Sequence, residues 1–213
     1  MCPTPITPPP SRWEAALSAP TTPPLPPLSP AGHLAASDPK HRTQMVAQEG
    51  ALQQLLLMAL SDSEQVACET CATLALLASH GPELAEAVAA RDVSPVLGLL
   101  RSEASPAVTL AALRVLCALA LTSTAAGARV AGEEVLDALE GLCTRPGVET
   151  GVLAAALEAV GNLCFGERVR AALRRRRPLM DAVDGLAGEA GGAGGGPVRA
   201  AAIRVLAILG GGS

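Results

Sequence analysis

A helical pattern of apolar residues recurs four times along the chain. Each copy is a run rich in Ala, Leu and Val, with polar residues placed so that one face stays apolar at helical spacing. The four runs are Thr70–Ala78, Ala111–Ala120, Ala155–Cys164 and Ala201–Gly210. Their last leucines, Leu77, Leu119, Leu163 and Leu209, are 42, 44 and 46 residues apart. A period of this length predicts stacked helical units, each of which buries its apolar face only against its neighbours.

Apolar periodicity and helix-breaking residues divide each repeat into a short, a medium and a long helix. Short helices are predicted at 42–48, 83–90, 125–131 and 167–175, and medium helices at 51–60, 94–100, 134–143 and 179–187. Six prolines lie before or within the first turn of apolar runs, where a missing backbone N–H is tolerated: Pro82, Pro95, Pro106, Pro146, Pro178 and Pro197. Four glycines are expected at joints that need a permissive backbone: Gly50, Gly81, Gly132 and Gly166. The glycine-rich segment 188–196 predicts a flexible loop before the last long helix.

Composition favours a closely packed all-α interior. Hydrophobic residues make up 49% of the chain, but there is one Trp, one Phe and no Tyr, so the core must consist of Ala, Leu and Val. The formal charge of −4 gives no general reason to bind nucleic acid or an anionic membrane. The most membrane-like stretch, Val108–Val130, contains Arg114 and is predicted to be a buried helix followed by a turn.

The first 39 residues are predicted to be a disordered tail. They contain 12 of the 18 prolines and cannot form a packed core. Pro23, Pro24, Leu25 and Pro26 spell a motif of the kind that some WW domains bind. Trp13 is expected either to anchor a partner or the rest of the chain, or to be incidental. Residues 1–10 contain no basic region followed by an apolar run, as a secretory signal would, so the protein is expected to be cytoplasmic, with nuclear entry as an alternative.

The triplet of helices with a period near 42 residues resembles the armadillo-repeat family. The segments MVAQEGALQQLLLMAL, at 45–60, and AALEAVGNLCFGE, at 155–167, resemble typical junctions of that family. The resemblance covers roughly residues 40–210 and implies a right-handed superhelical solenoid of about four repeats, at about 40–80, 81–123, 124–166 and 167–210, within a domain at 40–213. HEAT-like repeats are the alternative, since they differ mainly in whether the first helix is split.

The resemblance implies that partners lie along the concave face formed by the long third helices. In importin-alpha-like receptors, a Trp and an Asn four residues later repeat along that face. Here the Trp positions hold Ala72, Arg114, Glu158 and Arg204, and the Asn positions hold Leu76, Ala118, Asn162 and Ile208. Only Asn162 matches, which argues against nuclear-import cargo. We expect Arg114, Glu158, Asn162 and Arg204 to hold an extended or helical peptide of mixed charge; the alternative is an ordinary solvated helix face.

A cysteine–histidine cluster and an arginine run each allow a functional and a purely structural interpretation. Cys68 and Cys71 with His80 have partial metal-ligand spacing, but no fourth ligand follows, so core packing is favoured and no metal is expected. The other helical cysteines, Cys117, Cys143 and Cys164, are likewise predicted to be reduced core thiols. The run Arg174–Arg177, with Arg168 and Arg170 upstream, is a nuclear-import signal, a patch for an acidic partner, or a solvated helix end favoured by the helix dipole.

The function expected is a non-catalytic interaction scaffold without a cofactor. Three histidines and no phosphate-binding loop offer little for catalysis. Two alternatives remain: a chaperone cofactor that promotes nucleotide exchange on an Hsp70-type partner, and a cytoskeletal, ciliary or kinase-associated adaptor recruited through the tail. The last run has no evident polar cap, so Ile203, Val205 and Leu206 are expected to include exposed apolar surface and to permit end-to-end self-association.

Overall fold

The computed structural model describes residues 38–48, 50–101, 104–188 and 196–210, and within these ranges it consists of helices arranged in threes. The first helices are α3 (Pro39–Ala47), α6 (Pro82–Ala89), α9 (Thr124–Val130) and α12 (Glu167–Arg175). The second helices are α4 (Ala51–Met58), α7 (Ser94–Arg101), α10 (Glu133–Thr144) and α13 (Arg177–Gly188). The third helices are α5 (Glu64–Ser79), α8 (Pro106–Thr122), α11 (Thr150–Leu163) and α14 (Gly196–Gly210).

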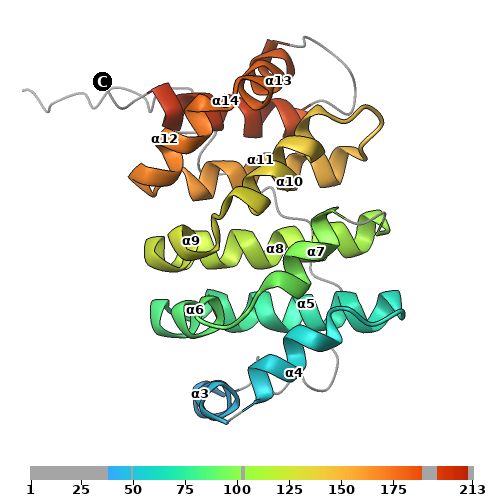
Figure 1. Ribbon diagram of the computed structural model, residues 1–213, viewed down its shortest axis with the longest axis vertical. Coiled ribbons are helices and arrows are strands. Elements are labelled where there is room, and N and C mark those ends of the chain that lie inside the picture. Colours follow the sequence, from blue (N-terminus) through green and yellow to red (C-terminus); the bar gives the residue numbers. More distant parts are fainter. Residues whose placement is uncertain (1–37, 49, 102–103, 189–195, 211–213) are drawn as a thin grey trace, which may run out of the picture.

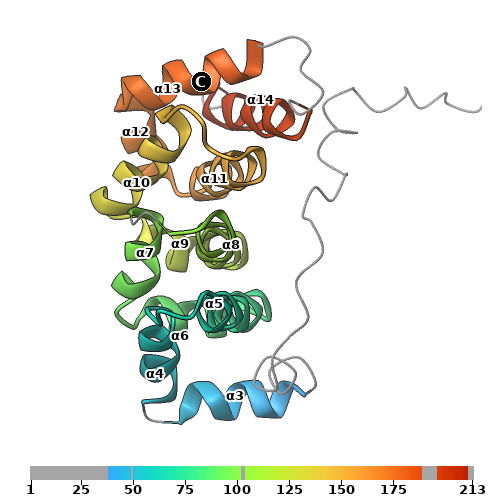
Figure 2. The ribbon, with the colours of Figure 1, turned by 90° about the vertical axis from the view of Figure 1, so that its right-hand side faces the viewer.

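The helices stack in chain order along the longest axis of the molecule (Figure 1). Viewed from the side, α5, α8, α11 and α14 form one column, and α4, α7, α10 and α13 form a second column beside it (Figure 2). Helix α3 lies across the N-terminal end of the stack. The predicted armadillo-like solenoid of four three-helix repeats is therefore confirmed.

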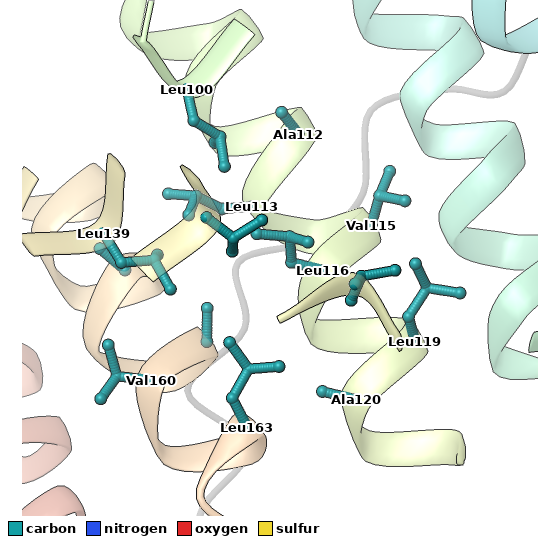
Figure 3. Packing of buried hydrophobic residues seen from close by; sticks show 14 of the residues in the cluster. Leu100, Ala112, Leu113, Val115, Leu116, Leu119, Ala120, Leu139, Val160 and Leu163 are labelled. Atoms are coloured by element: carbon teal, nitrogen blue, oxygen red, sulfur yellow. The ribbon is translucent and has the colours of Figure 1, made fainter. Parts of the chain in front are cut away.

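The core is continuous from one repeat to the next. Leu113, Leu116 and Leu119 of α8 are almost completely buried, between α5 on one side and α11 on the other. Figure 3 shows these leucines beside Leu139 of α10 and Leu163 of α11. Burying one leucine side chain contributes about 1.5–3 kcal/mol, and because both flanks of α8 are covered, neighbouring repeats stabilise each other.

Serine caps and prolines set several helix starts. The side chains of Ser63, Ser105 and Ser123 accept hydrogen bonds from backbone N–H groups at the starts of α5, α8 and α9. Pro82 and Pro106 are the first residues of α6 and α8. The membrane-like stretch Val108–Val130 is broken at Ser123 into α8 and α9, as predicted. Within the described ranges, no helix combines the length and the apolar character needed to cross a membrane.

The prediction for the joint glycines is half wrong. Gly50 and Gly81 have φ of 82° and 146°, which favours glycine. Gly132 and Gly166 have φ of −69° and −77°, an extended conformation open to any residue. Sequence alone did not separate the two kinds of joint because a glycine before a helix serves either as a left-handed corner or as an ordinary N-cap.

Helix boundaries shift most at N-termini. The third helices begin five or six residues before the predicted apolar runs, at Glu64, Pro106, Thr150 and Gly196. Their first turns mix Val with polar residues, Pro or Gly, so the continuous apolar run starts only after them. Helix α3 begins at Pro39 rather than Arg42. The predictions for Trp13, for Pro23, Pro24, Leu25 and Pro26, and for most of the glycine loop at 188–196 concern residues outside the described ranges.

Candidate partner-binding surface on the third helices

Three of the predicted site residues, Arg114, Glu158 and Arg204, occupy equivalent positions on consecutive third helices, and Asn162 lies one turn after Glu158. Arg114 lies on α8, Glu158 and Asn162 lie on α11, and Arg204 lies on α14. All four side chains are partly exposed, whereas Ala72, the equivalent of Arg114 on α5, is buried. We call Arg114, Glu158, Asn162 and Arg204 the polar strip.

An ion pair joins two repeats within the polar strip. The Arg204 guanidinium Nη2 is 3.4 Å from Glu158 Oε1, and the side chains of Arg204 and Glu158 are 25% and 22% exposed. Partial burial reduces solvent screening, so this pair is more firmly held than one on an open surface. The structure thus brings Glu158 and Arg204 together, 46 residues apart in the chain.

The pKa of the Cys117 thiol is influenced by three residues of the polar strip. Burial raises the pKa of Cys117 to about 12, and the Glu158 carboxylate adds to the increase. A hydrogen bond from Asn162 and the charge of Arg114 act in the opposite direction. Glu158, Asn162 and Arg114 therefore all lie close enough to act on one thiol of α8.

Apolar side chains border the strip. On the third helices, the partly exposed apolar residues are Leu76 of α5, Leu110 and Ala118 of α8, and Ile208 of α14. Leu121, near the end of α8, is 69% exposed. The face therefore offers a short line of charged and amide groups with apolar contacts beside it, which suits a peptide better than a small molecule.

The described structure does not bring Cys68, Cys71 and His80 together as a group that could hold a metal ion. Cys71 is fully buried, and burial raises the pKa of its thiol to about 12, which disfavours the thiolate that binds metal. The His80 ring, protonated at Nδ1, donates a hydrogen bond of 2.7 Å to the carbonyl oxygen of Leu76. In the described parts of the chain, no group of three or more His, Cys, Asp or Glu side chains is placed to hold a metal ion.

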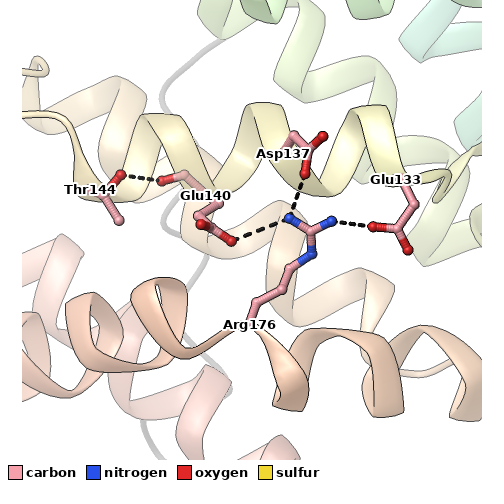
Figure 4. Close-up of polar contacts among 5 residues, drawn as sticks. All are labelled: Glu133, Asp137, Glu140, Thr144 and Arg176. Carbon is pink, nitrogen blue, oxygen red and sulfur yellow. Dashed lines mark hydrogen bonds and ion pairs between the residues drawn. The ribbon is translucent and has the colours of Figure 1, made fainter.

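The arginine run is not uniformly solvated. Arg176, between α12 and α13, points at three carboxylates of α10 (Figure 4). Its Nη1 donates to Asp137 Oδ1 at 2.7 Å and to Glu140 Oε2 at 3.2 Å, and its Nη2 donates to Glu133. Only 15% of the Arg176 side chain is exposed. The solvated-helix-end interpretation is therefore wrong for this arginine.

Burial opposes the charge of Arg176, but the three carboxylates outweigh it and raise the pKa of Arg176 above its ordinary value. Sequence reasoning missed this cluster. The available signal was the spacing of Glu133, Asp137 and Glu140, which puts three acids on one helical face opposite a basic junction.

At the end of the stack, the expected apolar surface is present only in part. Ile203 is 47% exposed and Leu206 is half-buried, but Val205 is buried in the core. The equivalents of Ile203 in the other repeats, Cys71, Leu113 and Leu157, are all buried, because a following third helix covers each of them.

Comparisons with known proteins identify the architecture. A scan against protein-family models finds no match. A designed armadillo-repeat protein solved with the peptide (KR)4 superposes with a TM-score of 0.71 at 20% identity, covering 84% of this chain and 72% of that one. An engineered protein superposes with a TM-score of 0.71 at 22% identity, covering 92% and 74%.

One curated protein shows a local sequence match. Phospholipase A I of Arabidopsis thaliana is 30% identical over 128 residues, which is 60% of this chain and 10% of that protein. The chain thus spans about a tenth of the length of this relative. The helical triplets and the two superpositions together show that this chain has the armadillo-repeat fold.

Proposed function

We propose that this protein is a non-catalytic interaction module that binds a peptide along the column of α5, α8, α11 and α14. The polar strip of Arg114, Glu158, Asn162 and Arg204 is the proposed contact. The observation that supports this most is the Arg204–Glu158 pair, which holds two charged groups of neighbouring repeats 3.4 Å apart in a partly buried setting. Groups already held in place lose less entropy when a ligand binds.

The chemistry of the strip favours a partner of mixed charge. Two arginines offer donors to carboxylates, and Glu158 offers an acceptor to a cation. Asn162 has both a carbonyl and an amide group, so it can hydrogen-bond the backbone of an extended peptide. The designed armadillo-repeat protein was solved with a wholly basic peptide; Arg114 and Arg204 disfavour such a ligand here.

A non-catalytic role is supported by the state of the thiols. Burial raises the pKa values of Cys71, Cys117, Cys143 and Cys164 to about 12. Thiols protonated in this way are poor nucleophiles.

Fluorescence anisotropy with labelled peptides tests the proposal. An alternating Glu–Lys peptide is expected to bind more tightly than (KR)4. The triple variant Arg114→Ala/Glu158→Ala/Arg204→Ala is expected to weaken the binding of the Glu–Lys peptide by about tenfold or more, equivalent to about 1.4 kcal/mol.

A matched control lies on the second-helix column. Arg101 and Glu134 form an exposed ion pair between neighbouring repeats, with a 3.5 Å N–O distance, and Arg145 is exposed nearby. The variant Arg101→Ala/Glu134→Ala/Arg145→Ala also removes two arginines and one glutamate, and is expected to bind like the native protein. Equal binding by the strip variant and the native protein would contradict the proposed site.

A further inference from the structure

Helix α12 concentrates positive charge on an otherwise acidic protein. Residues 167–177 contain six arginines and one glutamate, whereas the whole chain has a formal charge of −4. Arg176 is already paired with three carboxylates of α10. The other arginines of this segment are a separate surface from the polar strip, since they belong to the first helix of the last repeat.

The geometry of α12 places three of these arginines around one small residue. Val169 and Leu173 are buried against the core. The opposite face is exposed and carries Arg168, Ala171, Arg174 and Arg175. Residues three or four positions apart are neighbours on a helix, so each of the three arginines lies one turn from Ala171. We call Arg168, Arg174 and Arg175 the α12 basic patch.

The patch is held in place from two sides. The Arg174 guanidinium Nη2 donates a hydrogen bond to the carbonyl oxygen of Leu209, at the end of α14. Directly after α12, Arg176 ties the chain to α10. A surface fixed in this way loses little freedom when it binds a partner.

An apolar side chain lies close to the patch along the chain. Phe165, the only phenylalanine of the protein, is 55% exposed and precedes α12 by one residue. Exposed aromatic side chains are frequent anchors in protein interfaces. Glu167, at the start of α12, is exposed and is the one carboxylate of this helix, so the local charge remains strongly positive.

We propose that the α12 basic patch with Phe165 binds an acidic peptide segment that carries an apolar residue. Glu or Asp side chains of the partner pair with Arg168, Arg174 and Arg175, since guanidinium and carboxylate match in a two-hydrogen-bond geometry. The apolar residue of the partner packs on Phe165. Charge complementarity favours this partner over an import receptor that reads an extended basic run, because the arginines lie on a helix and Arg176 is paired internally.

An acidic peptide is also favoured over a nucleic acid. The net charge of the protein repels a long polyanion beyond the patch. Proteins that bind single strands stack successive bases on several aromatic side chains, whereas this protein has a single Phe and a single Trp.

Fluorescence anisotropy with a labelled Glu- and Asp-rich peptide containing one Phe tests this proposal. The variant Arg168→Gln/Arg175→Gln is expected to raise the Kd by about tenfold or more, and Phe165→Ala by about threefold or more. Glutamine keeps the helix propensity near that of arginine, and Arg174 is left intact because it contacts α14. A melting curve like that of the native protein confirms that each variant is folded.

Two controls separate the outcomes. Arg91→Gln/Arg145→Gln removes two exposed arginines elsewhere and is expected to leave the Kd unchanged. The polar-strip triple variant is also expected to keep acidic-peptide binding, so this site can fail or succeed independently of the proposed function. Unchanged binding in Arg168→Gln/Arg175→Gln, or tighter binding of a single-stranded oligonucleotide than of the peptide, would overturn the proposal.

Discussion

Arg176 donates a hydrogen bond of 2.7 Å to Asp137, a residue 39 positions earlier in the chain. With Glu133 and Glu140, Asp137 fixes the junction of α12 and α13 against the preceding repeat. In a solenoid each repeat contacts only its neighbours. The contact between Arg176 and α10 is therefore expected to stabilise the whole last repeat.

Replacing Arg176 by Met is expected to lower the free energy of unfolding by about 1–2 kcal/mol, between the values for exposed and buried ion pairs. The arginine is largely buried, but Glu133 and Asp137 are 78% and 61% exposed at their side chains, so solvent reduces the cost. Urea unfolding measures the effect. Arg175→Met is the control because Arg175 is exposed. An equal decrease in the free energy of unfolding in this control would show that the contacts of Arg176 with α10 do not stabilise the protein.

Two helix-interior glycines are expected to respond in opposite directions to alanine. A Cβ on Gly127 of α9 would be 3.0 Å from the backbone Cα of Ala120, so Gly127→Ala forces the helices apart and is expected to destabilise by about 1–3 kcal/mol. A Cβ on Gly98 of α7 meets nothing within 4 Å. Gly98→Ala is expected to stabilise by about 0.5–1 kcal/mol. Equal effects in urea unfolding would contradict the close packing of α9 on α8.

The helix cap at Ser123 is expected to contribute more to stability than the cap at Ser63. Its Oγ accepts from the backbone N of Ala126 at 3.2 Å and donates to Glu86 Oε1 at 2.9 Å. Ser123→Ala is expected to cost about 1–2 kcal/mol. Ser63 caps α5 through a 3.5 Å contact in an exposed position. Ser63→Ala is therefore expected to lower the free energy of unfolding by only about 0.5 kcal/mol. Thermal and urea unfolding of the two variants give the comparison.

The buried thiols are expected to make stability fall at alkaline pH. Their pKa values rise from 9.0 to about 12 on folding for Cys71, Cys143 and Cys164. Between these values the unfolded chain has lost protons that the native protein keeps, so the stabilisation is complete below pH 9 and is lost as pH rises towards 12. Urea unfolding at a series of pH values measures this loss.

The same thiols are expected to react slowly with a disulfide reagent in the native protein and rapidly in urea. Cys68, which is only partly buried, is expected to react before Cys71. A Cys2→Ser background keeps the N-terminal thiol out of the count. Native labelling of Cys71 at the rate found in urea would contradict its burial.

Part of the polar strip could be predicted by aligning the sequence repeats. Aligning the four apolar runs puts Arg114, Glu158 and Arg204 at one position, and the structure places them on consecutive stacked helices. Equivalent positions meet because successive repeats have the same geometry. The alignment did not show that Glu158 pairs with Arg204, since that depends on side-chain directions across two helices.

The sequence by itself determined the helices, their grouping in threes and the residues that form the core, because apolar period, serine caps and prolines act within a few positions along the chain. Only the tertiary structure decided which glycines needed a left-handed backbone. It also decided that Arg176 faces the acidic side of α10, whereas Arg168 and Arg175 stay exposed. Those outcomes depend on contacts between residues a whole repeat apart. Their energies arise from burial and charge pairing that exist only once the repeats are stacked.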